Sequence, residues 1–236
     1  MRPTPLAVTL AACLVVACGG SPGLRPSPSP APSGGNVNTE LRLHAAATAG
    51  DLVALEALIT AGARLDARDG DGRTAVMAAT AARQAAAVRV LLDAGADVDI
   101  RDDRLDNPFL YAGAEGLLDI LRLANEAGAD PAITNRFGGI ALIPAAERGH
   151  VEVVRYLLAE SDVDVDHVNK LGWTALLEAI ILSDGGPAHR EIVALLIEHG
   201  ADVDLADRDG VTPLAHARAR GYAGIAALLE AEGAGE

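Results

Sequence analysis

A dipeptide that returns at a fixed interval constrains the fold of this chain more than any other feature. Gly-Ala occurs at Gly62, Gly95 and Gly128, at intervals of 33 residues, and once away from this interval at Gly113. It returns at Gly200 and Gly233, which are again 33 residues apart. A fixed spacing of this size is the signature of repeat proteins, in which each unit packs on its neighbours. The body of the chain is therefore predicted to be a linear stack of similar units.

The interval between Gly128 and Gly200 is six residues longer than two periods, and the extra residues lie in two places. One lies within AESDVDVD (residues 159–166), where the second unit reads DAGADVD (residues 93–99). The other five lie between Thr174 and Glu191, around LSDGGPAH (residues 182–189), which we call the insertion.

The insertion has two interpretations. Lengthening a loop from about four to about nine residues costs only about 0.6–0.7 kcal/mol in closure entropy, so a neutral surface insertion is easily tolerated. The alternative is a polar finger that touches a partner protein. Its residues would be Ser183, Asp184, Gly185, Gly186 and His189.

Each unit contains the signals for two short helices. A residue that can cap free backbone N–H groups precedes the first helix of four units: Thr74, Asn107, Thr174 and Thr212. The second helices carry apolar residues in pairs one turn apart, which predicts one buried stripe. The fourth unit shows this with Val153, Val154, Leu157 and Leu158. Since no unit can bury its stripe alone, stacking is expected to form the core.

Two irregularities fall in the middle units. The third unit, RLDNPFLYAGAEG (residues 104–116), lacks the glycine of the Asx-to-Gly turn found in its neighbours. Asp106 is expected to take the positive-φ position there, because aspartate tolerates it better than most residues. Pro144 lies about one turn into the first helix of the fourth unit. That helix is expected to lose one backbone hydrogen bond or to start at a shifted position.

The period and three of its segments resemble the ankyrin repeat: RGHVEVVRYLL (residues 148–158), GWTALLEA (172–179) and GVTPLAHA (210–217). The resemblance covers about residues 40–233. It implies an all-α solenoid of six helix-turn-helix units joined by β-hairpin-like loops, with the first and last units as caps. The predicted units are about 39–70, 71–103, 104–136, 137–170, 171–208 and 209–236.

The bulk composition agrees with helices and excludes one class of partner. Half of the residues are apolar but only 3% are aromatic, and a core rich in Ala and Leu favours closely packed helices. The net charge is −14, from 19 Lys+Arg against 33 Asp+Glu. Nucleic-acid phosphates require a basic stripe, so this charge argues against nucleic acid and suits a basic partner surface.

The first 38 residues are predicted to be a targeting signal followed by a spacer. An apolar run over residues 6–17 is too short to cross a bilayer and predicts a signal peptide over residues 1–17. Val15-Val16-Ala17-Cys18 resembles a lipobox, which implies lipid attachment at Cys18. Leu10-Ala11-Ala12-Cys13 is a rival lipobox that leaves a shorter apolar run, and an ordinary secretory signal is a third interpretation.

Residues 18–38 are rich in Pro, Ser and Gly, which predicts an extended tether that reaches up to about 50–60 Å. The repeat domain would follow over residues 39–236. Gly19 after the cysteine resembles the class of lipoproteins sorted to the outer membrane. We therefore expect a location in the bacterial cell envelope, on the periplasmic face of the outer membrane, with the lipid as the only membrane contact.

The ankyrin resemblance implies that the hairpin row and the first helices line a concave binding face. Phe137 and Trp173 flank hairpin glycines in adjacent units, and aromatic and arginine side chains are typical binding anchors. An alternative for Trp173 is that it covers the edge of the next unit. Tyr111 and Tyr156 are expected in the core. The predicted partner-binding residues are Arg73, Arg136, Phe137, Lys170, Trp173, Glu178, Asp184, His189 and Arg208.

The sequence gives little support for a metal site or a catalytic site. SDVDVDHVN (residues 161–169) lacks EF-hand spacing and its glycine, which favours solvated acids. Ser183, Asp184 and His189 are triad residue types without a nucleophile elbow, and no HExxH, GxGxxG or P-loop occurs.

The expectation is thus a monomeric, non-enzymatic module without metal or cofactor that binds an unidentified protein. Two alternatives share the same fold. One is an accessory protein that stabilises or protects an envelope enzyme, for example an enzyme of oxidative stress. The other is an acidic inhibitor or immunity-type protein whose charge attracts a basic target.

Overall fold

The structure is a computed structural model that describes residues 37–235, and these form α-helices and loops with no β-strand. The helices come in six pairs. The first helices of the pairs are α1 (Val37–Ala49), α3 (Ala75–Ala81), α5 (Pro108–Glu115), α7 (Leu142–Glu147), α9 (Ala175–Ile181) and α11 (Pro213–Ala219). The second helices are α2 (Leu52–Thr60), α4 (Ala85–Asp93), α6 (Leu118–Glu126), α8 (Val151–Glu160), α10 (Pro187–Glu198) and α12 (Ala223–Glu232).

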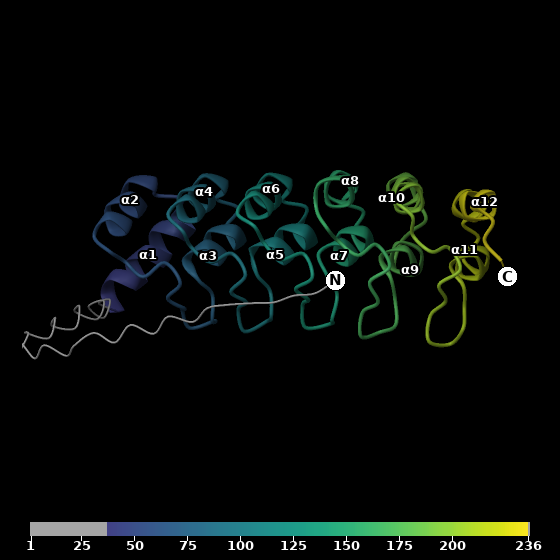
Figure 1. The fold of residues 1–236 in the computed structure, drawn as a ribbon, viewed down its shortest axis with the longest axis horizontal. Coiled ribbons are helices and arrows are strands. Elements are labelled where there is room, and N and C mark those ends of the chain that lie inside the picture. The colour runs from purple at the N-terminus through teal and green to yellow at the C-terminus, as the bar shows by residue number, and fades with distance from the viewer. Residues whose placement is uncertain (1–36, 236) are drawn as a thin grey trace, which may run out of the picture. The chain divides into compact units, whose positions relative to one another are not determined.

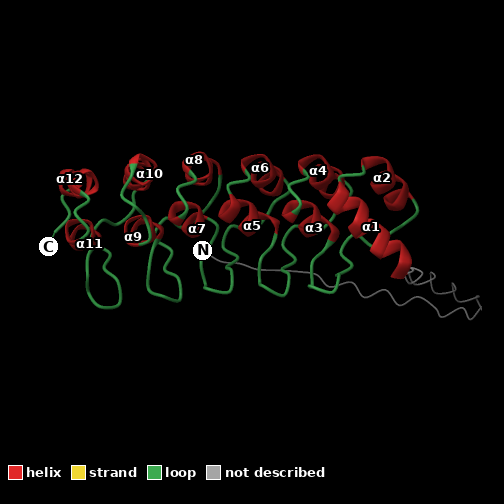
Figure 2. Cartoon of the chain, turned by 180° about the vertical axis from the view of Figure 1, so that it is seen from behind, coloured by secondary structure: helices red, strands yellow, loops and turns green. Residues whose placement is uncertain are grey.

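The pairs stack side by side into a solenoid with three layers. In Figure 1 the second helices form one row, the first helices form a row beneath it, and long loops extend beyond the first helices. The view from behind shows the same order of layers (Figure 2). The all-α solenoid of six units is confirmed for the part of the chain that the structure describes. The hairpin-like loops contain turns in place of strands.

The predicted helix caps are confirmed. The Thr74 hydroxyl accepts a hydrogen bond from the Met77 amide, and the Asn107 side chain accepts one from the Leu110 amide, at 3.3 and 2.9 Å. Thr174 and Thr212 make the same bond in the last two units. Each bond satisfies a backbone N–H that has no partner within the helix, which fixes where the first helix begins.

The fourth unit begins its first helix late, as Pro144 predicts. α7 starts at Leu142 after Ala141, which makes no side-chain cap. Pro144 therefore lies in the first helical turn, where a missing N–H costs no intrahelical hydrogen bond. This shift leaves α7 with six residues.

The third unit departs from the prediction at its turn. The residue with positive φ is Leu105, at 64°, and not Asp106. The Asp102 amide donates to the Asp106 carbonyl as the Asp69 amide donates to the Arg73 carbonyl, so Leu105 takes the place of Gly72. The Asp102 carboxylate accepts two backbone N–H groups across this turn, and these bonds hold the leucine in its strained conformation.

One continuous core runs through the stack, from Leu43 in α1 to Leu229 in α12. The predicted stripe of α8 contributes Val153, Val154 and Leu157 to it. The tyrosine prediction was wrong in part. Tyr156 packs against the margin of the core with Arg122 5.4 Å from its ring centroid, whereas Tyr111 is half-buried and lines a surface groove.

Aspartates of the loops tie neighbouring units together. The carboxylates of Asp66, Asp99 and Asp166 each accept a hydrogen bond from a backbone amide of the next unit, at 2.9 to 3.1 Å. Asp166 belongs to the acidic run at residues 161–169, so part of this run has a structural role. Within residues 37–235 the acidic and histidine side chains form no group of three able to hold a metal ion.

The five extra residues of the fifth unit are shared between a loop and a helix. α9 ends at Ile181 and α10 begins at Pro187, whereas three residues separate α11 from α12. α10 has 12 residues, against nine in α4 and α6. The prediction of a nine-residue loop was therefore wrong, because Pro187 is well suited to the first turn of a helix and extends α10 backwards. None of the helices in the described region is long and apolar enough to cross a membrane.

Candidate functional site

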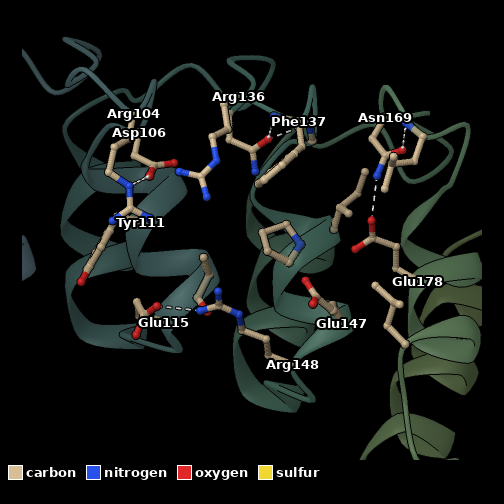
Figure 3. Close-up of a pocket in the computed structure, with 17 residues that line it drawn as sticks. Arg104, Asp106, Tyr111, Glu115, Arg136, Phe137, Glu147, Arg148, Asn169 and Glu178 are labelled. Carbon is tan, nitrogen blue, oxygen red and sulfur yellow. Dashed lines mark hydrogen bonds and ion pairs between the residues drawn. The ribbon is translucent and has the colours of Figure 1, made fainter.

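A groove lies on the face formed by the loops and first helices of the third, fourth and fifth units (Figure 3). Its volume is about 250 Å³. α5, α7 and α9 form its floor, and the loops before these three helices form its upper rim. Its lining residues are Arg104, Asp106, Tyr111, Ala114, Glu115, Asn135, Arg136, Phe137, Gly139, Ile143, Pro144, Glu147, Arg148, Asn169, Leu171, Glu178 and Leu182.

Charges at the third-unit end of the groove are paired. The Arg148 guanidinium lies 2.6 Å from the Glu115 carboxylate, and the Arg104 guanidinium lies 3.9 Å from the Asp106 carboxylate. Burial raises the pKa of Asp106, and the charge of Asp102 raises it further against the opposing effect of the nearby arginines. Each carboxylate at this end is therefore paired with an arginine, and Arg136 adds a further positive charge close to Asp106.

Apolar side chains exposed to solvent line the groove from the fourth unit to the fifth. Phe137, Leu171 and Leu182 are 53%, 50% and 48% exposed, and we call these three residues the apolar wall. The Arg136 guanidinium stacks over the Phe137 ring at 4.6 Å from its centroid, a cation–π contact. Scattered surface leucines need no explanation, but several large apolar groups in one concavity indicate a contact surface.

The fifth-unit end of the groove contains a buried carboxyl group. Glu178 projects from α9, only 5% exposed, and its Oε1 accepts a hydrogen bond from Asn169 Nδ2 at 2.7 Å. Asn169 is itself held by the amides of Leu171 and Trp173, which donate to its Oδ1. Burial raises the pKa of Glu178 to about 7, and the charge of Glu147 adds to this rise. The sequence analysis predicted Glu178 as a partner-binding residue, and the depth of its burial was missed.

The structure brings three of the nine predicted binding residues into the groove: Arg136, Phe137 and Glu178. Lys170 lies on the rim, where its ammonium group donates to the Arg136 carbonyl at 3.0 Å. Trp173 is half-buried and lies outside the groove lining.

Two of the predicted arginines lie elsewhere along the loop row. Arg73 pairs with Asp69 and Asp71, both at 2.9 Å, beside a second pocket lined by residues of the second and third units. The side chain of Arg208 packs over the backbone of Gly172. Neither arginine takes part in the groove.

The insertion lies against both neighbouring units. His189 Nε2 is 3.0 Å from the Glu147 carbonyl oxygen of the fourth unit, and His189 Nδ1 is 3.3 Å from the Asp184 carboxylate. From the sixth unit, the Tyr222 hydroxyl donates to the Ser183 carbonyl at 2.6 Å. Asp184 and His189 thus have structural contacts, and Leu182 at the start of the insertion joins the apolar wall.

Sequence reasoning missed five groups that shape the groove: Arg104, Glu147, Arg148, Leu171 and Leu182. A signal for two of them was present. Glu147 ends the first helix of the fourth unit and Leu171 precedes a hairpin glycine, so both belong to the first helices and hairpin row that the ankyrin resemblance placed on the concave face.

The geometry defines a class of protein: a helical repeat solenoid with an open groove on its loop side. Comparison with known families makes the assignment specific. The family model described as ankyrin repeats, in three copies, matches residues 33–102 and 109–207, well over half of the sequence. The chain belongs to the ankyrin-repeat family, and the matching model describes a repeat and names no catalytic family.

Similar bacterial proteins are known. The chain is 54% identical over 99 residues to the putative ankyrin repeat protein YahD of Escherichia coli K12, covering 42% of this chain and 49% of that protein. The crystal structure of an ankyrin repeat domain from Acinetobacter baumannii AYE has a TM-score of 0.80 and 54% identity, with 82% of this chain and 98% of that chain covered.

A second solved structure, that of the ankyrin repeat protein EF0377, has a TM-score of 0.78 and 35% identity, with 81% of this chain and 97% of that chain covered. The chain thus spans about half the length of its curated E. coli relative and nearly the whole of both solved domains.

Proposed function

We propose that this chain is a non-enzymatic protein-binding module that captures a partner protein in the groove of its third to fifth units. The observation that carries the proposal is the apolar wall, three large side chains about half exposed in one concavity. Membership of the ankyrin-repeat family supports binding of protein partners as the general activity.

The groove has the composition of an interface centre. Aromatic and arginine side chains are enriched in binding hot spots, and here Arg136 stacks on Phe137. The backbone of the wall is held by hydrogen bonds: the Phe137 and Leu171 amides donate to asparagine side chains, and the Leu182 amide donates to the Glu178 carbonyl. Their backbone is therefore ordered before a partner arrives. An open solenoid face of this kind presents a surface in place of an enclosed reaction pocket.

We further propose that a lipid on Cys18 and the tether at residues 18–38 hold this module in the bacterial cell envelope, at the periplasmic face of the outer membrane. The support comes from the sequence alone, since both segments lie outside the described residues except for 37 and 38. Anchoring would confine the groove to partners at the same membrane.

The experiment that tests the proposed function is crosslinking of tagged protein in cells, followed by identification of what is recovered. We expect one partner to be recovered with wild type and to fall at least about tenfold with Phe137→Ala, as for a hot-spot residue. Val53→Ala is the matched control, because Val53 is an apolar residue of the first unit, 79% exposed and outside the groove.

The salt dependence of the complex distinguishes binding in the groove from simple charge attraction. A complex formed through the apolar wall should survive about 0.5 M NaCl, since exposed charges are screened there but apolar contacts are not. The net charge of −14 favours an acidic inhibitor as the second candidate. A complex that is lost in this salt and is unaffected by Phe137→Ala would reject the groove in favour of that candidate.

A further inference from the structure

The charges of the groove are unevenly distributed. At the third-unit end, Arg104 and Arg148 each face a carboxylate within 4 Å. At the fifth-unit end, Glu147 and Glu178 lie together, and neither forms an ion pair with a residue of the described region. Charge at this end is therefore negative and uncompensated.

The second oxygen of the Glu178 carboxyl is the particular feature of this end. Oε1 bonds to Asn169, whereas Oε2 has no hydrogen-bond partner among residues 37–235. The carboxyl projects from α9 into the groove on the side where Glu147 projects from α7 (Figure 3). No buried side-chain polar atom of the described residues lacks a hydrogen-bond partner, so Oε2 is open to the groove and can accept a hydrogen bond from a donor that arrives with a ligand.

We propose that the groove receives a basic side chain of the partner protein, an arginine or a lysine, whose charged head lies between Glu147 and Glu178. Its aliphatic stem would run along the apolar wall. This inference rests on the proposed function and specifies the chemistry that the partner must present.

The site suits an amphipathic cation better than a neutral group. Long basic side chains bury their methylene stems on apolar surface while the charged head seeks a polar partner. The wall supplies that surface through Leu182, whose amide donates to the Glu178 carbonyl, and through Leu171, whose amide donates to the Asn169 side chain that also bonds Glu178. A cation between two carboxylates satisfies the free oxygen and removes the repulsion between them. A metal ion fits less well, because no third carboxylate or histidine joins the pair in the described region.

The test uses Nα-acetyl-arginine amide as the probe, with Nα-acetyl-citrulline amide as the uncharged control of similar shape. NMR of the folded protein follows the Asn169 side-chain amide and the Glu178 carboxyl carbon. We expect the arginine probe to bind with a Kd in the millimolar range and to lower the Glu178 pKa. Binding should be about tenfold tighter at pH 8 than at pH 6, because a carboxyl with a pKa near 7 is mostly ionised only at the higher pH.

Variants assign the effect to the two carboxyls. Glu178→Gln retains an oxygen for the Asn169 hydrogen bond, so the fold is preserved. This variant should bind the arginine probe about tenfold more weakly than wild type, and its binding should no longer depend on pH. Glu147→Gln should weaken it as well. Asp209→Asn removes one exposed charge from the sixth unit and serves as the matched control, expected to bind as wild type.

The outcomes separate this inference from the proposed function. Three results would each overturn the proposal that the groove receives a basic side chain. They are equal binding of the citrulline probe, no binding of the arginine probe in the millimolar range, and arginine binding that Glu178→Gln does not change. Partner capture that depends on Phe137 but not on Glu178 would reject this inference and leave the groove intact. Partner capture that Phe137→Ala does not reduce would reject the groove as the binding site.

Discussion

At the scale of single residues, Glu178 links the groove to the stability of the fold. A carboxyl with a raised pKa favours the protonated form in the folded state, since burial penalises the charge more than the Asn169 hydrogen bond stabilises it. The folded protein then holds this proton more tightly than the unfolded chain between pH 4.5 and about 7. Ionising Glu178 above that range costs stability, a pattern common to groups kept for function.

Glu178→Gln should therefore stabilise the folded protein at pH 8 and change little near pH 4.5. Stability conferred by the protonated carboxyl is fully present below pH 4.5 and is lost as the pH rises to about 7, whereas glutamine cannot ionise. We expect a gain of about 1–3 kcal/mol in the free energy of unfolding at pH 8, measured by urea denaturation at both pH values. Glu198→Gln, at an exposed carboxyl of α10, should keep the wild-type profile. If the free energy of unfolding changed with pH in the same way for Glu178→Gln and wild type, the burial of this charge would be contradicted.

The sequence predicted the role of a residue where that role depends on its neighbours along the chain. It missed the role where distant segments create the environment. The caps at Thr74 and Asn107 were predicted because a cap needs only the three residues that follow it. Leu105 was missed because aspartate, and not leucine, is the residue that chemistry favours at positive φ. The depth of Glu178 was missed because Glu147, 31 positions earlier, and the loop of Asn169 create it.

At the scale of the elements, the insertion acts as a bridge between units. Its five extra residues extend α10 and add a short loop. The first turn of α10 is bonded to the fourth unit through His189, and the loop is bonded to the sixth unit through Tyr222. The repeat period predicted where the extra residues enter the chain. It could not predict how they divide between helix and loop, because that depends on contacts with units on both sides.

Tyr222→Phe should lower the free energy of unfolding by about 1 kcal/mol, because the Ser183 carbonyl loses the hydroxyl that donates to it at 2.6 Å. Urea denaturation measures the change. Tyr111→Phe is the matched control, since the Tyr111 hydroxyl has no hydrogen-bond partner among residues 37–235, and we expect no loss there. Equal effects in the two variants would show that the insertion loop is not held by this bond.

At the scale of the whole molecule, the groove is a product of the stacking of the repeat units. The groove combines residues from Arg104 to Leu182, which come together only because consecutive units repeat the same orientation. The repeat pattern was sufficient to predict the solenoid and the row of loops that bears the groove. It could not select the third to fifth units, because the groove arises where local irregularities coincide: the Leu105 turn, the late start of α7 and the insertion.

In the proposed arrangement the position of this surface in the cell depends on Cys18, and that dependence is open to a direct test. Cys18→Ala should abolish incorporation of an alkyne fatty acid and release the protein from the membrane fraction, because one acylated residue supplies the whole membrane affinity in the proposed arrangement. Gel fluorescence after click labelling and fractionation of bacterial cells measure the two effects. Cys13→Ala is the matched control for the rival lipobox and should retain both label and membrane association. The reverse result would move the attachment to Cys13, and label on neither cysteine would leave an ordinary secretory signal, so that the groove would meet its partner free of the membrane.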